Sequence, residues 1–373
     1  MMSAELSTET FSSPKPAGLL SMANASQTVP AMHLIRPDGP PRMSDVAKLA
    51  GVSKMTVSRV LAGHAVVAAE TRERVLRAVE ALGYVADAAA GTLSSGRSDF
   101  VAVLVPSLSS SNFSDTVRGL SAALEPKGLQ LLIGDTDYDI EREERLVRSL
   151  LRYQPRSVAL TGAFHTEATT ALLRRAGVPI VEMWDLPADP IDAAVGFSNQ
   201  RAAREMLVYL HARGYRRIGF IGGASNADRR GAERLKGYRL GMRALGLGEP
   251  RVVQLGQSPA TMVHGGPALD QLLERWPDTD AVMAVSDLSA FGAIMQCHRR
   301  GLRVPEDIAV AGFGDFEVAE CSRPSITTVT VDAHGIGLMT GDVLCAAMAG
   351  GTAASAATRH FKIRYSVVPR ESA

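Results

Sequence analysis

A short stretch near the N-terminus carries side chains suited to nucleic-acid recognition. They are cationic, hydroxylated or flexible and apolar: Ser53, Lys54, Met55, Thr56, Ser58 and Arg59. A guanidinium group can form two hydrogen bonds with the edge of a guanine, whereas small hydroxyl groups bind phosphate oxygens without reading the base. The stretch therefore predicts a base contact from Arg59 and backbone contacts from the hydroxyl groups.

A helix-turn-helix is expected to position these side chains. The apolar spacing predicts three short helices, at about 43–50, 54–61 and 70–82. Val46, Leu49 and Ala50 share one face of the first helix, and Ser53 is suited to cap the second. In such an arrangement the second helix enters the major groove with its first residues at the base edges. We therefore predict a DNA-binding domain over residues 43–84.

The rest of the chain alternates strand and helix patterns, which is typical of an α/β fold. Short apolar runs predict buried parallel strands at 100–105, 130–133, 158–161, 179–183, 218–221, 252–255, 281–285 and 308–313. Amphipathic helices separate them, and a last strand is expected at about 361–368. Two successive β-α-β sets predict two doubly wound subdomains, with a ligand in the cleft between them.

These patterns divide the chain into four parts. Residues 1–42 are rich in Ser, Thr, Pro and Ala, so they are expected to be a disordered tail or to precede the true start of translation. The head spans 43–84, a hinge spans 85–98, and the core spans 99–373. Each lobe of the core is expected to contain two segments: about 99–197 with 331–350, and about 198–330 with 351–373.

Composition and charge exclude several classes of protein. The 373 residues carry a net charge of only +1, so a DNA-binding surface must be local, and residues 42–97 hold eight basic and five acidic side chains. Cys297, Cys321 and Cys345 are scattered, as in a reduced, cytoplasmic protein. No apolar run reaches the roughly 18 residues of a membrane span, so no membrane partner is expected.

Motifs for catalysis are absent from the sequence. It contains no glycine-rich nucleotide loop, no Gly-x-Ser-x-Gly turn and no metal-ligand spacing of His, Asp and Glu. We therefore expect no enzyme activity, no catalytic residue, no metal and no cofactor, and only a small-molecule effector in the cleft.

Several strings in the head fit one known pattern: Asp45-Val46-Ala47, Gly51-Val52-Ser53, Thr56-Val57-Ser58-Arg59-Val60-Leu61 and Leu82-Gly83-Tyr84. They resemble the lactose/galactose repressor family, and the resemblance extends from residue 43 to about 370. It implies a core of the periplasmic-binding-protein-like type that senses a small molecule. It also implies a cytoplasmic homodimer that represses genes by binding double-stranded operator DNA, with Lys54, Met55 and Arg59 selecting the operator.

The resemblance assigns Leu93, in the hinge, to a wedge that enters the minor groove and kinks the DNA. The hinge departs from the family pattern, because Ala86-Asp87 and Gly91-Thr92 stand where a Pro-Asn pair and an Arg are usual. A negative charge at Asp87 would oppose the phosphates. Leu93 as an ordinary apolar linker residue therefore stays an alternative.

The resemblance also places effector contacts in loops of both lobes and, for Arg234, in a loop-helix segment of the second lobe: Ser107, Asn112, Phe113, Arg234, Ser286, Asp287 and Asp315. Ser286 replaces an Asn that is common in the family, and Gly314 stands where neutral-sugar binders use an Asp to hold hydroxyl groups. Loss of that carboxylate while Arg234 is kept favours an anionic ligand on Coulomb grounds. Asp315, one position later, could still substitute for it.

Shorter strings resemble the gluconate repressor subgroup in particular: Val105-Pro106-Ser107-Leu108, His165-Thr166, Val181-Glu182 and Ala194-Val195-Gly196-Phe197. They predict gluconate or a related sugar acid as effector, with Glu182 binding its hydroxyl groups and His165 either a ligand contact or a surface loop residue. Trp184 is expected to be a stacking wall or part of the core. A phosphosugar, a neutral sugar, a purine or a protein corepressor are alternatives, and induction or corepression stays open.

Overall fold

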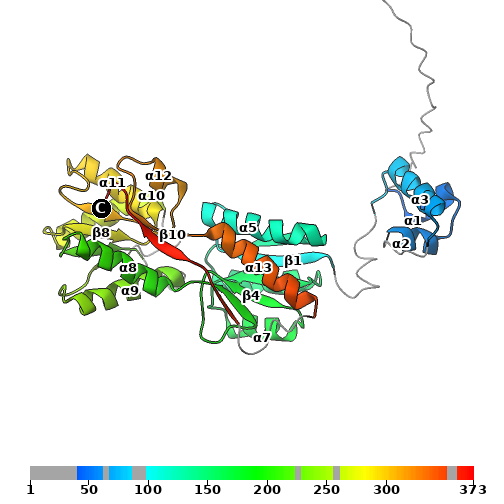
Figure 1. The fold of residues 1–373 in the computed structure, drawn as a ribbon, viewed down its shortest axis with the longest axis horizontal. Coiled ribbons are helices and arrows are strands. Elements are labelled where there is room, and N and C mark those ends of the chain that lie inside the picture. The colour runs from blue at the N-terminus through cyan, green and yellow to red at the C-terminus, as the bar shows by residue number, and fades with distance from the viewer. Residues whose placement is uncertain (1–39, 62–66, 86–97, 223–227, 255–260, 351–358) are drawn as a thin grey trace, which may run out of the picture. The chain divides into compact units, whose positions relative to one another are not determined.

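The computed structural model describes residues 40–61, 67–85, 98–222, 228–254, 261–350 and 359–373. The chain divides into two units, Met1–Ala86 and Asp87–Ala373, which contain the head and the core (Figure 1). Most of the predicted tail 1–42 and of the predicted hinge 85–98, including Leu93, lies outside the described residues.

The head consists of three helices: α1 Met43–Ala50, α2 Lys54–Leu61 and α3 Ala69–Leu82. Valines are buried between them: Val46, Val57, Val60 and Val75. Gly51 ends α1 with a φ of 65°, which glycine adopts without steric cost, and the chain turns there into α2. The expected buried face of α1 was wrong at Leu49, which is 45% exposed, because α2 and α3 cover the side of α1 that carries Ala47.

The first lobe of the core is a parallel sheet of six strands in the order β11-β5-β4-β3-β1-β2. The strands are β1 Phe100–Val105, β2 Gln130–Asp135, β3 Ser157–Thr161, β4 Ile180–Met183, β5 Ala193–Gly196 and β11 His360–Lys362. The helices are α5 Ser111–Leu124, α6 Ile140–Leu151, α7 Glu167–Arg175 and α13 Ala333–Met348. Side chains of β1 alternate: Val101 and Val103 are buried with α5 and α13, and Ala102 and Leu104 with α6 and α7.

The second lobe repeats this plan with a parallel sheet of four strands in the order β7-β6-β8-β9. Its strands are β6 Ile218–Ile221, β7 Arg251–Val253, β8 Ala281–Ala284 and β9 Ala309–Ala311. Its helices are α8 Asn199–Ala212, α9 Arg229–Leu245, α10 Met262–Arg275, α11 Asp287–Arg299 and α12 Glu317–Cys321. Residues of α8 and α9 join one apolar cluster, and residues of α10 and α11 join another, so the two pairs cover opposite faces.

An antiparallel pair, β10 Thr328–Val331 with β12 Tyr365–Val368, lies where the chain passes between the lobes (Figure 1). The strand expected at about 361–368 is therefore two strands. The first of them, β11, extends the first-lobe sheet beside β5, although residues 351–373 were expected in the second lobe. Such short strands contain too few residues for periodicity to indicate which sheet edge they join.

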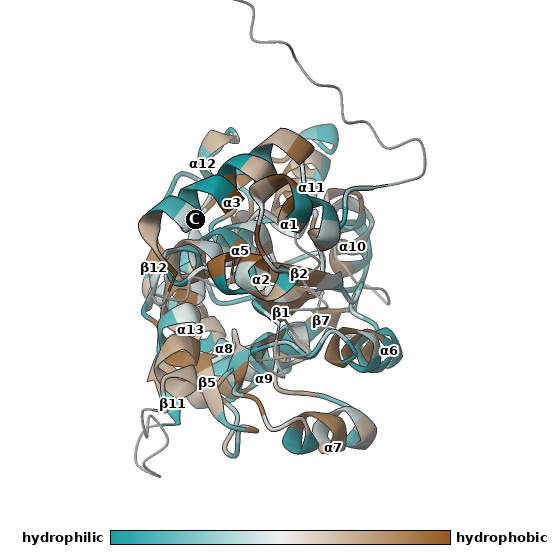
Figure 2. Cartoon of the chain, turned by 90° about the vertical axis from the view of Figure 1, so that its right-hand side faces the viewer, coloured by the Kyte–Doolittle hydropathy of each residue, from teal (hydrophilic) through white to brown (hydrophobic). Residues whose placement is uncertain are grey.

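The outer helices are amphipathic, as expected. Helix α6 buries Val147 and Leu150 and presents charged residues to solvent (Figure 2). Among the described residues, no helix is long and apolar enough to cross a membrane.

Glycines bring helix pairs of the core into backbone contact. A Cβ atom added at Gly119 of α5 would lie 2.1 Å from the carbonyl oxygen of His334 in α13. One added at Gly265 of α10 would lie 2.0 Å from the carbonyl oxygen of Ser289 in α11, and one at Gly237 of α9 would lie 2.1 Å from that of Gln200 in α8. These distances exclude any side chain, so the helix pairs depend on glycine at their contact points.

Candidate DNA interface and effector cavity

The candidate DNA interface is the outward side of α2. Four of the residues predicted to contact DNA are exposed on this helix: Lys54, Met55, Ser58 and Arg59. Val57 and Val60 hold the opposite side in the core of the head. The burial of these two valines leaves the cationic and hydroxylated side of α2 open to a partner.

Ser53 caps α2, as predicted. The backbone N–H of Thr56 donates to the Ser53 Oγ at 3.1 Å, and the two hydroxyl oxygens lie 2.9 Å apart. This cap starts the helix at Lys54, so that Lys54 and Met55 project from its first turn. The hydroxyl groups of Ser53 and Thr56 already bond to each other, so a phosphate contact from either would share this hydrogen bond.

A cavity of about 110 Å³ lies between the two lobes, at the carboxyl ends of their strands. Five of the predicted effector contacts line it: Ser107, Asn112, Phe113, Arg234 and Ser286. The Asn112 amide also donates to the carbonyl oxygen of Gly314 at 3.0 Å, which links the first lobe to the second. Ser286 accepts a hydrogen bond from the backbone of Ser289 and so caps α11 at the cavity wall.

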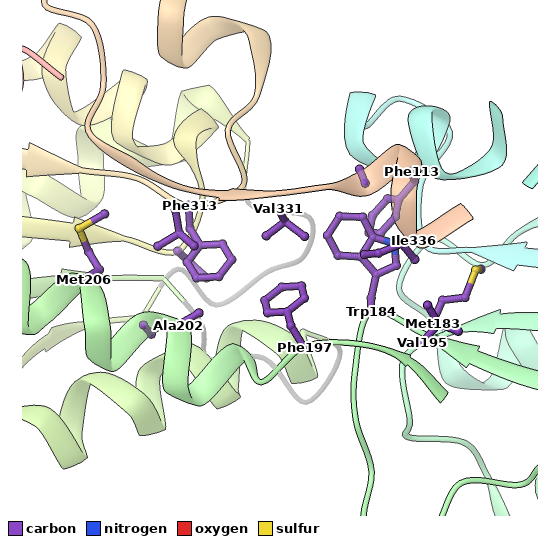
Figure 3. Close-up of a cluster of buried hydrophobic side chains, with 14 of the residues drawn as sticks. Phe113, Met183, Trp184, Val195, Phe197, Ala202, Met206, Phe313, Val331 and Ile336 are labelled. Atoms are coloured by element: carbon purple, nitrogen blue, oxygen red, sulfur yellow. The ribbon is translucent and has the colours of Figure 1, made fainter. Parts of the chain in front are cut away.

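Aromatic side chains of both lobes line this cavity, and Figure 3 shows Phe113, Trp184 and Phe313 within a cluster of buried apolar side chains. The rings of Phe113 and Trp184 meet edge to face with centroids 5.4 Å apart, and the Trp184 Nε1 donates to the hydroxyl of Thr116 at 3.1 Å. Trp184 is 2% exposed and lines the cavity, so it is both a core residue and a wall. Phe313 contributes a further ring from the other lobe, stacked on Phe197 with centroids 6.3 Å apart.

Arg234 is held rigidly in the cavity wall. Its Nε donates to the Asn199 Oδ1 at 2.9 Å, and its Nη1 donates to the carbonyl oxygen of Val285 at 2.7 Å. Its Cζ lies 3.7 Å from the centre of the Phe313 ring. Burial lowers the pKa of Arg234 to about 10, so the guanidinium still carries its charge at neutral pH.

Arg230, one turn earlier on α9, also lines the cavity and was missed in the sequence. Its Cζ lies 5.2 Å from the centre of the Phe113 ring and 5.8 Å from that of Tyr138, so aromatic faces of the first lobe receive this cation. The spacing of four residues from Arg234 was the available signal, because residues i and i+4 share a helix face. Asp228, which caps α9, is the acidic residue in the wall.

Two predicted effector contacts, Asp287 and Asp315, lie outside the cavity wall. Asp287 is fully buried: its carboxylate accepts from the backbone N–H of Phe316 at 2.8 Å and from the Thr328 hydroxyl at 2.5 Å. Burial raises the pKa of Asp287 to about 6. Asp315 instead forms an ion pair with Arg370 at 2.7 Å. Neither carboxylate lines the cavity, because each is occupied by a partner within the second lobe or its strand connections.

His165 and Glu182 do not line this cavity either, and His165 is not a surface residue. The imidazole lies between two buried carboxylates, with Nδ1 2.6 Å from Glu143 and Nε2 3.5 Å from Glu182. Glu182 also accepts from the backbone N–H of Ile191 at 2.7 Å. Although burial opposes protonation, the hydrogen bond to Glu143 and the negative charges of Glu143 and Glu182 raise the pKa of His165 to about 9. Glu143, His165 and Glu182 therefore form a buried ion cluster within the first lobe.

A second cavity of about 440 Å³ adjoins the first and shares Tyr138 and Arg230 with it. Arg229 lines this second cavity and not the first, with its Cζ 5.0 Å from the centre of the Phe164 ring. Across the part of the chain that the structure describes, no group of three or more His, Cys, Asp or Glu side chains has the arrangement of a metal site.

Known proteins share the sequence features of both the head and the core. Residues 42–87 match the model of bacterial regulatory proteins of the lacI family, and residues 207–373 match a periplasmic binding protein-like domain. The transcriptional regulator GntR of Pseudomonas aeruginosa is 39% identical over 315 residues, which cover 84% of this chain and 91% of that protein. The chain belongs to the lacI family. The predicted family and fold class are thereby confirmed for this lacI-family protein.

Solved structures of the family agree with the fold. The complex of the regulator CelR with cellobiose has a TM-score of 0.65 and 32% identity, and covers 89% of this chain and all of that one. The lac repressor dimer bound to operator has a TM-score of 0.78 and 25% identity, and the match covers 90% of this chain and 99% of that one. The named relatives are transcriptional regulators rather than enzymes.

Proposed function

We propose that this lacI-family protein is a transcriptional repressor whose affinity for operator DNA is lowered by a sugar acid such as gluconate. The observation that carries the effector class is the pair Arg230 and Arg234 in the wall of one small cavity between the lobes. Two cations in a partly desolvated site favour an anionic ligand, because charges interact more strongly where water is excluded.

The other groups in the wall suit the rest of a sugar acid. Ser107, Asn112 and Ser286 offer neutral donors and acceptors for hydroxyl groups, and Phe113 and Trp184 offer apolar faces for carbon atoms. Arg234 already donates two hydrogen bonds to the protein, so we assign the effector carboxylate mainly to Arg230. Asp287, Asp315, His165 and Glu182 are left out of the proposed contact set.

The DNA-binding part of the proposal rests on α2. A single helix-turn-helix reads one half-site, so a repressor of a pseudo-palindromic operator needs two copies of the head. The lac repressor is a dimer on its operator, and we propose a homodimer formed by the cores here as well. Leu93 is kept as the proposed minor-groove wedge. We infer that the protein acts in the cytoplasm, on chromosomal DNA, by binding alone and without a cofactor or a catalytic step.

Fluorescence anisotropy tests the proposal directly. A labelled palindrome from the region upstream of the gene is titrated with protein, with and without gluconate. Tight binding that gluconate weakens supports both the repressor and the ligand class. Arg230→Gln should bind the palindrome normally and lose most of the response to gluconate, whereas the neighbouring Arg229→Gln, in the second cavity, should keep it. Equal responses of the two variants would contradict the assignment of the carboxylate.

A neutral sugar is the second candidate effector, since the relative CelR is complexed with cellobiose. The same titration with cellobiose, a sugar phosphate and a purine in place of gluconate distinguishes these classes. A DNA complex that responds to none of them would favour a protein corepressor. Absence of specific binding to any upstream palindrome would contradict the repressor itself.

A further inference from the structure

A chain of hydrogen bonds crosses from one lobe to the other at Asn199. This residue is the first of α8, and its side chain is buried. Its Nδ2 donates to the Asp185 Oδ1 at 2.9 Å and to the carbonyl oxygen of Trp184 at 3.3 Å. Its Oδ1 accepts from the Arg234 Nε at 2.9 Å. Asp185 and Trp184 follow β4 of the first lobe, whereas Arg234 belongs to α9 of the second.

The chemistry of the Asp185 carboxylate, the Asn199 amide and the Arg234 guanidinium determines which group donates each hydrogen bond. An ionised carboxylate only accepts hydrogen bonds and a guanidinium only donates them, whereas an amide does both. The amide of Asn199 must therefore turn its NH₂ toward Asp185 and its oxygen toward Arg234. Neither an ionised Asp nor an Ala at position 199 could satisfy both neighbours.

These hydrogen bonds matter to the cavity because they position two of the residues that line it. Trp184 and Arg234 both line the cavity, and Asn199 bonds to the backbone of the first and the side chain of the second. Arg234 continues the chain to the carbonyl oxygen of Val285, beside the Ser286 cap of α11. A separation of the lobes would have to break the bonds of Asn199 on one side or the other.

We propose that Asn199 is a positioning residue of the effector cavity, which holds Arg234 of the second lobe in register with Asp185 and Trp184 of the first. The proposal rests on the proposed function for the identity of the effector but not for the coupling of the lobes. In this arrangement the protein presents its fixed cation to the cavity only while the lobes keep their mutual position.

The positioning role of Asn199 is tested in the full-length protein by exchanging the amide at position 199 with the carboxylate at position 185. Asn199→Asp removes the donor to Asp185 and sets two carboxylates against each other, so affinity for gluconate should fall about tenfold, as expected for the loss of one charge-assisted hydrogen bond. Adding Asp185→Asn restores a donor opposite the new acceptor with the original net charge, although it does not restore the bond to the Trp184 carbonyl, so the double variant should recover part of the lost affinity. Asp185→Asn alone keeps an oxygen that accepts from Asn199 and should change the affinity less than threefold.

Hydrogen–deuterium exchange of the free protein supplies a readout that needs no ligand. Asn199→Asp should speed exchange both in residues 180–185 of the first lobe and in residues 229–236 of the second, and the double variant should reverse part of both changes. This result without any gluconate binding by the wild type would refute the effector and keep the positioning role. Faster exchange in one lobe only would overturn the proposal. So would a double variant that stays unfolded or as perturbed as Asn199→Asp alone, because a restored hydrogen bond should restore part of the coupling.

Discussion

Arg59 is the side chain on α2 best suited to read a base, since it is exposed and its guanidinium fork matches a guanine. Arg59→Ala should relax discrimination at one base pair of the operator by about 1–3 kcal/mol and leave other positions unchanged. Anisotropy titrations with single-base variants of the palindrome measure this effect. Arg77→Ala is the matched control, because Arg77 is exposed on α3 and pairs with Glu73 at 3.8 Å. A uniform loss of affinity for every sequence would show that Arg59 contacts only phosphate.

His165 should make the stability of the core depend on pH. Its pKa of about 9 lies above the ordinary value of 6.5, so its protonated form stabilises the folded state fully below pH 6.5. This contribution is lost as the pH rises from 6.5 through 9. Urea unfolding of His165→Gln should therefore show a weaker decline over this range than the wild type. His298→Gln, at an exposed position, should follow the wild type. Equal slopes for His165→Gln and the wild type would contradict the buried ion cluster.

At this scale the sequence indicates positions better than roles. Ser107 and Arg234 were expected to contact the effector because the family resemblance carries such contacts to their positions, and both line the cavity. Asp287 occupies the same kind of position but turns inward to Thr328. His165 is buried and pairs with Glu143, which lies 22 residues earlier in the sequence. Which partner a polar side chain finds depends on tertiary contacts that no local pattern contains.

At the scale of elements, glycine contacts determine how closely helices pack. Gly265 and Gly266 are neighbours on α10, yet a Cβ at the first would lie 2.0 Å from a carbonyl oxygen of α11, and one at the second 3.5 Å from the flexible side chain of Gln296. Gly265→Ala should therefore force α10 and α11 apart and lower the unfolding midpoint. Gly266→Ala should lower it far less, because its Cβ has room beside α11 and is crowded only by the ring of Pro267, which follows it in the helix. Thermal unfolding compares the two variants. Similar destabilisation by both would refute the close contact.

Periodicity predicts most helices and central strands of the core, because each buries one face or both faces in a regular pattern. Strand β5 and helix α12 were not expected, since a run such as Ala193–Gly196 is too short to show a period. The glycine contacts were not predicted either. A glycine within a helical pattern indicates a weak helix by propensity alone, and only the neighbouring helix reveals why Gly265 lies there.

At the scale of the whole core, the lobes are joined by short connections between β5 and α8, β10 and α13, and β11 and β12. Connections of this kind allow two rigid lobes to change their mutual position while each keeps its own sheet. The cavity draws its walls from both lobes, so a ligand in it must bind one mutual position better than another. The order of strands and helices predicts two lobes, but it does not predict which side chains meet between them.

A repressor controlled in this way must obey thermodynamic reciprocity. If gluconate weakens operator binding by a given factor, saturating operator must weaken gluconate binding by the same factor, because both paths lead to the same ternary complex. Isothermal titration of gluconate into the free protein and into its operator complex measures that factor, and a scrambled duplex of equal length is the control. Equal gluconate affinities in the two titrations would mean that gluconate binding and operator binding are not coupled, so that any operator release in anisotropy comes from the ionic strength of the gluconate salt. The interlobe cavity would then have to be abandoned as the site of control.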